Sequence, residues 1–184
     1  KGKGKTTILG GFGVNGKQNV KIQQLSARNI AGHGLDCRNG ATVDVTECCF
    51  KSCRDDGMHV RDGATVTATQ CEFMENGGRA VFCLRANTKV RLNDCKVHHN
   101  GMSGLLALND AVVDVHGTKT DIHSNKCGIG AGHRGKVNIH LPSQHNTSHD
   151  NVREDRTQVR GGSIANINAD GTFTHVEEVD YDDY

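Results

Sequence analysis

The chain has 184 residues, which is enough for one domain with a substantial core. It contains 23 glycines, one proline and no tryptophan, and its 22 basic and 21 acidic residues nearly cancel. No apolar run approaches the roughly 18 residues that suggest a membrane span, and no basic stripe with interleaved aromatic residues marks a nucleic-acid surface. We therefore expect neither a membrane nor a nucleic acid as partner.

Residues 1–18 are rich in glycine and lysine. We interpret them as a basic N-terminal segment followed by a partial first coil around Ile8 and Leu9. No signal-like segment opens the chain. Because residue 1 is not methionine, the sequence is interpreted as part of a larger chain.

Residues 19–141 repeat one pattern at intervals of 22, 23, 24, 23 and 24 residues. Each repeat opens with apolar residues at alternate positions, as in ATVDVTEC from Ala41 and ATVTATQC from Ala64. Alternation with a period of two is typical of a β-strand rather than a helix. The corresponding segments start at Asn19, Ala41, Ala64, Thr88, Ala111 and Gly135.

Two further short strands are expected in each repeat. One ends at an apolar residue such as Phe50 or Phe73, and the other follows a glycine-containing turn, as in GLDC from Gly34 and GMHV from Gly57. Three strands in about 23 residues form one coil of a solenoid, and such coils stack about 4.8 Å apart. Equivalent residues should therefore lie in columns along the solenoid.

One column carries asparagine at the same bend of three consecutive coils. Five residues after Cys71, Cys95 and Thr120 come Asn76, Asn100 and Asn125, whereas the coil before them has Cys53 there. Stacked amides can hydrogen-bond to one another and to the backbone of the turn. The sequence therefore predicts an asparagine ladder.

The succession of Val-x-Val, asparagine, and glycine followed by an apolar strand resembles right-handed parallel β-helix repeats. Such repeats occur in the pectate-lyase-like superfamily and in carbohydrate-binding and sugar-hydrolase (CASH) domains. The resemblance covers residues 19 to about 140. It implies an all-β, single-stranded right-handed parallel β-helix of about seven coils.

After Leu141 the repeat pattern is lost. We expect residues 142–176 to form a polar excursion and a capping hairpin around Asp170 and Gly171. Residues 177–184 form an acidic tail with five carboxylates, which leaves 22 basic and 16 acidic residues in the rest of the chain. Asn146 stands in an NTS sequon, which is a glycan acceptor if the chain is secreted.

The eight cysteines are interpreted mainly as reduced, buried thiols. Cys48, Cys71 and Cys95 form one inward column, and their parallel side chains suit disulfide geometry poorly. Cys49 is expected to face outward and Cys127 to lie in a turn. Reduced thiols favour a cytoplasmic, intracellular location, and secretion stays open.

One turn of successive coils carries candidate catalytic residues. Aligning GHG, DDG and GGR puts His33, Asp56 and Arg79 in one column, with Asp55 beside them. The Gly-His-Gly and Asp-Asp pairs resemble polygalacturonase motifs, in which one carboxyl group acts as general acid and another activates water. Here their order is reversed, and no Asn-Thr-Asp occurs. A charge-balanced structural stack is the other interpretation.

Histidines form a second candidate site. His98 and His123 occupy equivalent outward positions of adjacent coils, as do His116 and His140. Such pairs can bind a transition metal or sense pH. Eleven histidines on a solenoid also stack by chance, so we predict no metal and no cofactor.

Two functions follow. The first is a non-catalytic recognition or scaffold module that binds a protein, less favourably a glycan, through outward residues. The resemblance suggests an intracellular substrate receptor of a ubiquitin ligase for this case. The second is a polysaccharide hydrolase or lyase using His33, Asp55, Asp56 and Arg79. The residues of the expected binding patch are Phe82, Leu84, Leu106, Leu108 and His59.

Overall fold

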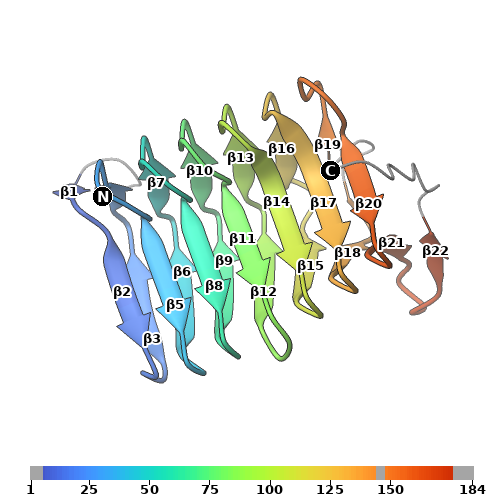
Figure 1. The fold of residues 1–184 in the computed structure, drawn as a ribbon, viewed down its shortest axis with the longest axis horizontal. Helices are drawn as coiled ribbons and strands as arrows, with labels where there is room; N and C mark the ends of the chain where they lie inside the picture. Colours follow the sequence, from blue (N-terminus) through green and yellow to red (C-terminus); the bar gives the residue numbers. More distant parts are fainter. Residues whose placement is uncertain (1–5, 144–147, 176–184) are drawn as a thin grey trace.

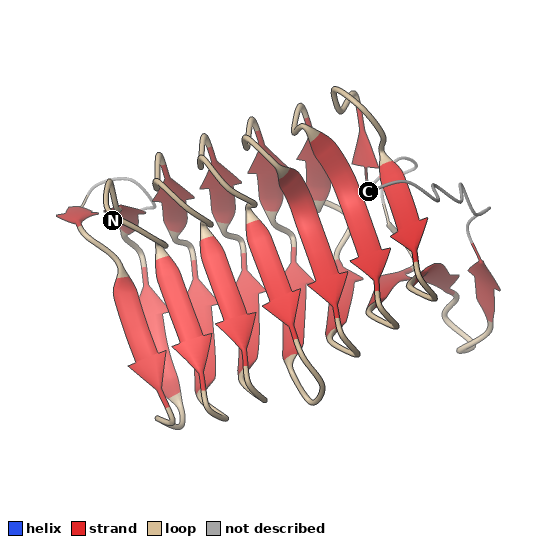
Figure 2. Ribbon diagram, viewed as in Figure 1, coloured by secondary structure: helices blue, strands red, loops and turns tan. Residues whose placement is uncertain are grey.

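The computed structural model describes residues 6–143 and 148–175. The chain winds through three β-sheets in turn, so that each coil contributes one strand to each sheet (Figure 1). Figure 2 shows strands and connecting turns throughout the described part. Within these ranges, no helix is long and apolar enough to cross a membrane.

Sheets A, B and C are named here for the three sides of the solenoid. Sheet A contains β1 (Thr7–Leu9), β4 (Ser26–Arg28), β7 (Cys49–Lys51), β10 (Glu72–Met74), β13 (Lys96–His98), β16 (Asp121–His123) and β19 (Ser148–His149). Sheet B contains β2 (Phe12–Asn15), β5 (Leu35–Arg38), β8 (Met58–Arg61), β11 (Val81–Leu84), β14 (Ser103–Leu108), β17 (Cys127–Gly132) and β20 (Arg156–Val159). Sheet C contains β3 (Val20–Gln23), β6 (Thr42–Thr46), β9 (Thr65–Thr69), β12 (Lys89–Asn93), β15 (Val112–His116), β18 (Lys136–His140), β21 (Ser163–Ile167) and β22 (Phe173–His175).

The core fills the space between the three sheets. Parallel pairing holds like residues in register, as where Val43 pairs with Val66 and Val66 with Val90. In sheet A, the rings of Phe50 and Phe73 stack with their centroids 5.5 Å apart. These inward side chains are buried, which confirms the predicted all-β parallel solenoid.

The cysteine column is buried as predicted. The thiols of Cys48, Cys71 and Cys95 each donate to a carbonyl of the preceding coil over 3.4–3.5 Å. Burial raises the pKa of Cys37 and of Cys83 to about 12, so these thiols stay protonated. All eight cysteines lie in the described part and are free thiols.

Cys49 corrects the sequence analysis. It pairs with Glu72 in the outward column of sheet A, yet it is only 5% exposed. The register therefore predicted correctly that this side chain points outward, but it did not predict that the side chain is buried. Cys127 is half-buried at the start of β17.

The asparagine ladder is present. Oδ1 of Asn100 accepts hydrogen bonds from the backbone N and Nδ2 of Asn76 at 3.1 and 2.9 Å. Oδ1 of Asn125 accepts the same two bonds from Asn100, at 3.1 and 2.8 Å. The ladder begins at Cys53, whose backbone N–H donates to Oδ1 of Asn76. Each Nδ2 also donates to a carbonyl of the preceding coil, on Phe50, Phe73 and Val97.

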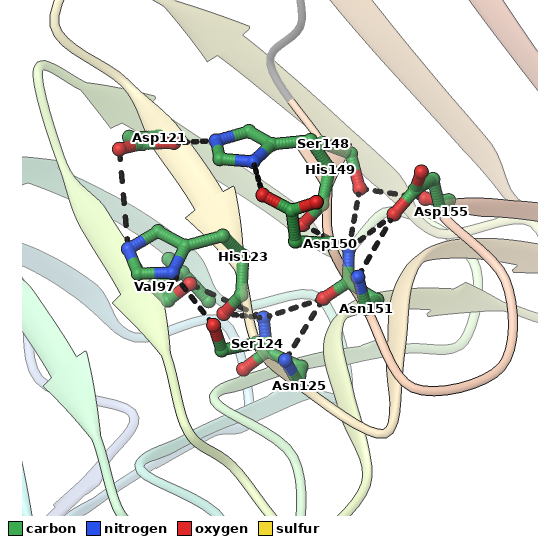
Figure 3. Close-up of polar contacts among 10 residues, drawn as sticks. All are labelled: Val97, Asp121, His123, Ser124, Asn125, Ser148, His149, Asp150, Asn151 and Asp155. Atoms are coloured by element: carbon green, nitrogen blue, oxygen red, sulfur yellow. Dashed lines mark hydrogen bonds and ion pairs between the residues drawn. The ribbon is translucent and has the colours of Figure 1, made fainter.

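The ladder has a further rung that the sequence analysis missed. Oδ1 of Asn151 accepts from the backbone N and Nδ2 of Asn125 at 2.9 and 3.2 Å (Figure 3). Beyond it the carboxylate of Asp155 takes the place of the next amide, accepting from Nδ2 of Asn151 at 2.8 Å. The exposed acid thus satisfies the last amide of the column.

The expectation that the parallel repeat ends at Leu141 is wrong. Strands β19, β20 and β21 pair in parallel with β16, β17 and β18, so a further coil extends to Ile167. Its inward positions are partly polar, which hid the strand pattern. These polar groups are satisfied locally: Ser148 Oγ donates to the carbonyl of Asp155, and Gln158 Oε1 accepts from the backbone N of Ile164.

The hairpin predicted around Asp170 and Gly171 is confirmed. Strand β22 pairs antiparallel with β21 and covers the last strand of sheet C. An uncovered edge strand invites pairing with another chain, so this hairpin protects one of the three sheet edges. Asn146 and the acidic tail of residues 177–184 lie outside the described residues.

We expect Asn100→Ala to lower the free energy of unfolding by about 2–4 kcal/mol, because it leaves buried donors and a buried carbonyl without partners. The measurement is urea denaturation followed by circular dichroism. Asn93→Ala is the matched control, since the Asn93 side chain makes two long hydrogen bonds, at 3.2 and 3.4 Å, on the outer face of sheet C. It should change stability by about 0.5 kcal/mol or less. Equal midpoints for both variants would contradict a stabilising role of the ladder.

Candidate functional site

The predicted column of His33, Asp56 and Arg79 does form, in the turns that precede sheet B. Asp56 is 3% exposed, and its two carboxylate oxygens have different partners. Oδ1 accepts from the backbone N of Arg79 at 2.8 Å and lies 3.6 Å from the Arg79 guanidinium. Oδ2 contacts Nδ1 of His59 at 3.1 Å. We call His33, Asp56, His59 and Arg79 the Asp56 stack.

A glycine in the following coil leaves room for this carboxylate. A Cβ atom at Gly78 would lie 2.6 Å from Oδ1 of Asp56. The glycine of the GGR turn is therefore required by close approach of the buried acid one coil away.

The charge of Asp56 is stabilised despite its burial. Burial alone would raise the pKa of this carboxyl group, but the hydrogen bonds from His59 and from the Arg79 backbone, with the Arg79 charge, outweigh it. The pKa of Asp56 consequently lies below its ordinary value. An ionised, buried acid with both oxygens in use is poorly placed to donate a proton to a substrate.

Arg79 and His59 together cover Phe82. The Arg79 guanidinium lies 4.3 Å from the centroid of the Phe82 ring, and the His59 ring meets it edge-on with centroids 5.0 Å apart. Phe82 is thus 8% exposed, and the expectation that it forms part of an exposed patch is wrong. Its outward position in β11 was correct, but the cation–π contact buries it.

Asp55 does not join the stack. It is exposed, and its backbone N–H donates to the carbonyl of Gly32 in the preceding coil. Of the four predicted catalytic residues, the structure therefore brings together His33, Asp56 and Arg79 and leaves Asp55 outside. His33, Asp56 and His59 each offer one ligand atom, and these three atoms lie within 4.8 Å of one another. The three residues could therefore hold a metal ion.

A surface depression lies on the outer face of sheet B, next to the Asp56 stack. Leu106 and Leu108 of β14 line it, and Gly130 and Gly132 of β17 stand beside them in register. A Cβ atom at Gly130 would lie 2.8 Å from Cδ1 of Leu106, so the leucine lies across the glycine. The depression has a volume of about 930 Å³.

The rim of the depression is mostly basic. Four cationic side chains line it, and Glu154 is the acidic residue among the described lining residues. The four cations are Arg79, Lys126, Arg153 and Arg160. Arg79 therefore belongs both to the Asp56 stack and to the depression.

Sequence reasoning named Leu106 and Leu108 as patch residues and Arg79 as a catalytic candidate, and missed the depression that all three line. It also named Leu84, which is half-buried and pairs with Leu108. The signal was available in the strand CGIGAG, where glycine replaces the outward apolar residues of the preceding coil. The last coil supplies the opposite wall, and the sequence analysis did not recognise that coil.

One of the two predicted histidine columns is longer than predicted. The rings of His98 and His123 stack with centroids 5.2 Å apart, and His149 continues the column 5.5 Å from His123. His116 and His140 stack at 3.9 Å. His149 was missed because it lies in the unrecognised last coil.

The neighbours of His123 and His149 shift their pKa values in opposite directions (Figure 3). The hydrogen bond to Asp150 at 2.8 Å, supported by Asp121 at 2.9 Å, raises the pKa of His149 against the effect of burial. Burial lowers the pKa of His123, and the adjacent histidine charges add to this effect against that of Asp121.

The three parallel sheets and their stacked turns define the class of protein, a parallel β-solenoid. The family model described as "Right handed beta helix region" matches residues 7–148, so the chain belongs to the right-handed β-helix family. The searches of curated proteins and of solved structures returned no match. The family shows the fold, and one fold hosts many unrelated activities.

We expect Asp56→Ala to lower the free energy of unfolding by about 3–5 kcal/mol, because it leaves the His59 ring and the Arg79 amide without their buried acceptor. Asp55→Ala is the adjacent control and should change stability by about 0.5 kcal/mol or less. Thermal or urea unfolding in a chelator measures both. A loss for Asp55→Ala as large as that for Asp56→Ala would contradict the stack.

We expect His149 to titrate above and His123 below the ordinary histidine pKa of 6.5. NMR of the ring carbon–proton signals across pH 5–8 measures both, with single His→Gln variants for assignment. Asp150→Ala should lower the pKa of His149, because it removes the hydrogen-bonded carboxylate, and should leave His116 unchanged. Identical titration of the two histidines would contradict these contacts.

Proposed function

We propose that this chain is a non-catalytic recognition module, which binds an acidic and partly apolar segment of a partner protein in the depression on sheet B. The observation that carries the proposal is the depression itself. Half-buried leucines and outward glycines form its apolar side, and four cationic side chains surround it. Apolar surface framed by charge is typical of a protein contact site.

The charges favour an acidic partner segment. Arg79, Lys126 and Arg160 line the depression from the coils of β11, β17 and β20, and Arg153 adds a fourth cation. Charge complementarity of this kind steers association and rejects basic partners. A glycan is less favoured, because sugar recognition leans on exposed aromatic rings, the chain has no tryptophan, and Phe82 is covered.

The Asp56 stack supports this proposal because it holds Arg79 in place. Its ion pair and backbone hydrogen bond fix Arg79, and the guanidinium lies over the Phe82 ring, 4.3 Å from its centroid. A cation held in this way loses little side-chain entropy when a carboxylate binds it. The buried acid thus positions one contact residue of the depression.

A polysaccharide hydrolase or lyase is the alternative function. It requires an accessible acid and base about the scissile bond. Asp56 is buried, ionised and fully engaged, and Asp55 stands alone at the surface of this turn. The geometry of the column therefore favours the structural role of Asp56 over catalysis.

Peptides selected from a displayed library of random 12-residue segments test the proposal. We expect the selected peptides to be rich in aspartate and glutamate around one or two large apolar residues. In fluorescence anisotropy, Leu106→Asp should weaken binding by at least about tenfold, because it places a charge like that of the peptide in the apolar floor.

The matched control is Leu9→Asp, since Leu9 is 82% exposed on a different sheet. It should leave the peptide affinity unchanged. Selection of basic peptides, equal losses in both variants, or tighter binding of a random oligonucleotide would contradict the proposal. Release of reducing ends from polygalacturonate that is abolished by Asp55→Asn would establish the alternative instead.

A further inference from the structure

Three donor atoms of the Asp56 stack converge on one point. Oδ2 of Asp56 lies 3.1 Å from Nδ1 of His59 and 3.5 Å from Nδ1 of His33. A tetrahedral zinc ion with bonds of about 2.0–2.1 Å separates its ligand atoms by about 3.3 Å. Two of the three separations are therefore close to those in a zinc coordination shell, and all three ligand atoms lie within 4.8 Å of one another.

One of these contacts lacks a proton. The backbone N–H of Asp56 donates to Nδ1 of His33 at 3.1 Å, so this ring nitrogen is an acceptor. The carboxylate oxygen 3.5 Å away is an acceptor as well. Two electron-rich atoms thus lie close together, and a cation bound to Nδ1 would take over the lone pair that now accepts from the Asp56 amide.

The other oxygen of the carboxylate remains available to Arg79. Oδ1 holds the Arg79 amide and guanidinium, whereas Oδ2 faces the two imidazoles. A metal on Oδ2 therefore leaves the backbone hydrogen bond from Arg79 to Oδ1 in place. The proton on Nδ1 of His59 would move to Nε2, which has no hydrogen-bond partner among the described residues, so the ring stays neutral.

From this geometry we infer that His33, Asp56 and His59 form a binding site for a divalent transition-metal ion. Two imidazoles and one carboxylate suit Zn²⁺, Co²⁺, Ni²⁺ or Cu²⁺ rather than Mg²⁺ or Ca²⁺. Three protein ligands leave one coordination position for water. The side chain of His33 is 30% exposed, which provides a path for the ion from solvent.

The histidine column on sheet A is the competing site within the same molecule. Its rings at His98 and His123 are stacked almost parallel, with an interplanar angle of 5°. Parallel rings direct their nitrogens side by side rather than toward a common point. Among the described residues, the Asp56 stack alone brings three such ligand atoms within 4.8 Å of one another.

Titration of the metal-free protein with Co²⁺, followed by competition with Zn²⁺, tests the inference. We expect one equivalent of Co²⁺ to give the visible absorption of a tetrahedral site, without a thiolate charge-transfer band, and Zn²⁺ to displace it. His33→Ala should weaken Zn²⁺ binding by at least about tenfold against a chromophoric chelator. Because His33 is partly exposed, this variant should keep the fold, which circular dichroism checks.

His98→Ala is the matched control, because Nδ1 of His98 lies 2.8 Å from Nδ1 of His99 and offers the nearest rival pair. It should leave Zn²⁺ affinity unchanged. If His33→Ala unfolds, His33→Gln replaces it with the same expected loss. No cobalt absorption, a thiolate band, or loss of binding in His98→Ala rather than in His33→Ala would overturn the inference. None of these results decides whether the depression binds a peptide, so the two proposals fail separately.

Discussion

Stacking of each coil on the next in strict register is the constraint on which the rest of the structure depends. Parallel pairing holds every side chain next to its equivalent one coil away, so a residue must be compatible with its column. The asparagine column meets this demand by making each amide serve both neighbours, as Asn100 does for Asn76 and Asn125. The cysteine column meets it with small thiols that donate to the preceding coil. Columns are therefore the units of stability.

The same register brings the residues of the Asp56 stack together. Four polar side chains from three coils meet because their turns are in register, and the burial of Asp56 follows from the glycine that lies against it. An acid in such a place stabilises its neighbours more effectively than it attacks a substrate. Through Arg79 the stack also reaches the rim of the depression. The buried ionic network and the depression thus share one residue.

Much of this fold could be predicted from the period of the apolar residues, because strand alternation and a constant repeat length directly reflect the geometry of a coil. Asn76, Asn100 and Asn125 were predictable for the same reason. The last coil was not, since Ser148, with other polar residues, takes inward positions where one side lacks a following coil. The exposure of Phe82 was also mispredicted, because a column gives the direction of a side chain but not what covers it. The depression arises from the absence of side chains at Gly130, which a search for functional residue types overlooks.

The two oxygens of the Asp56 carboxylate contact different partners, and this connects the two proposals. Neither proposal requires the other to be correct. Oδ1 of Asp56 fixes Arg79 at the depression, and Oδ2 faces His33 and His59. An ion on Oδ2 would compete with Arg79 for the negative charge and weaken that pair by Coulomb repulsion, yet the backbone hydrogen bond from Arg79 would persist. The guanidinium would then be held mainly by Phe82 and would be more available to an acidic segment. Metal binding at the stack would therefore tune the recognition surface through one side chain, whereas the surface itself needs no metal to exist.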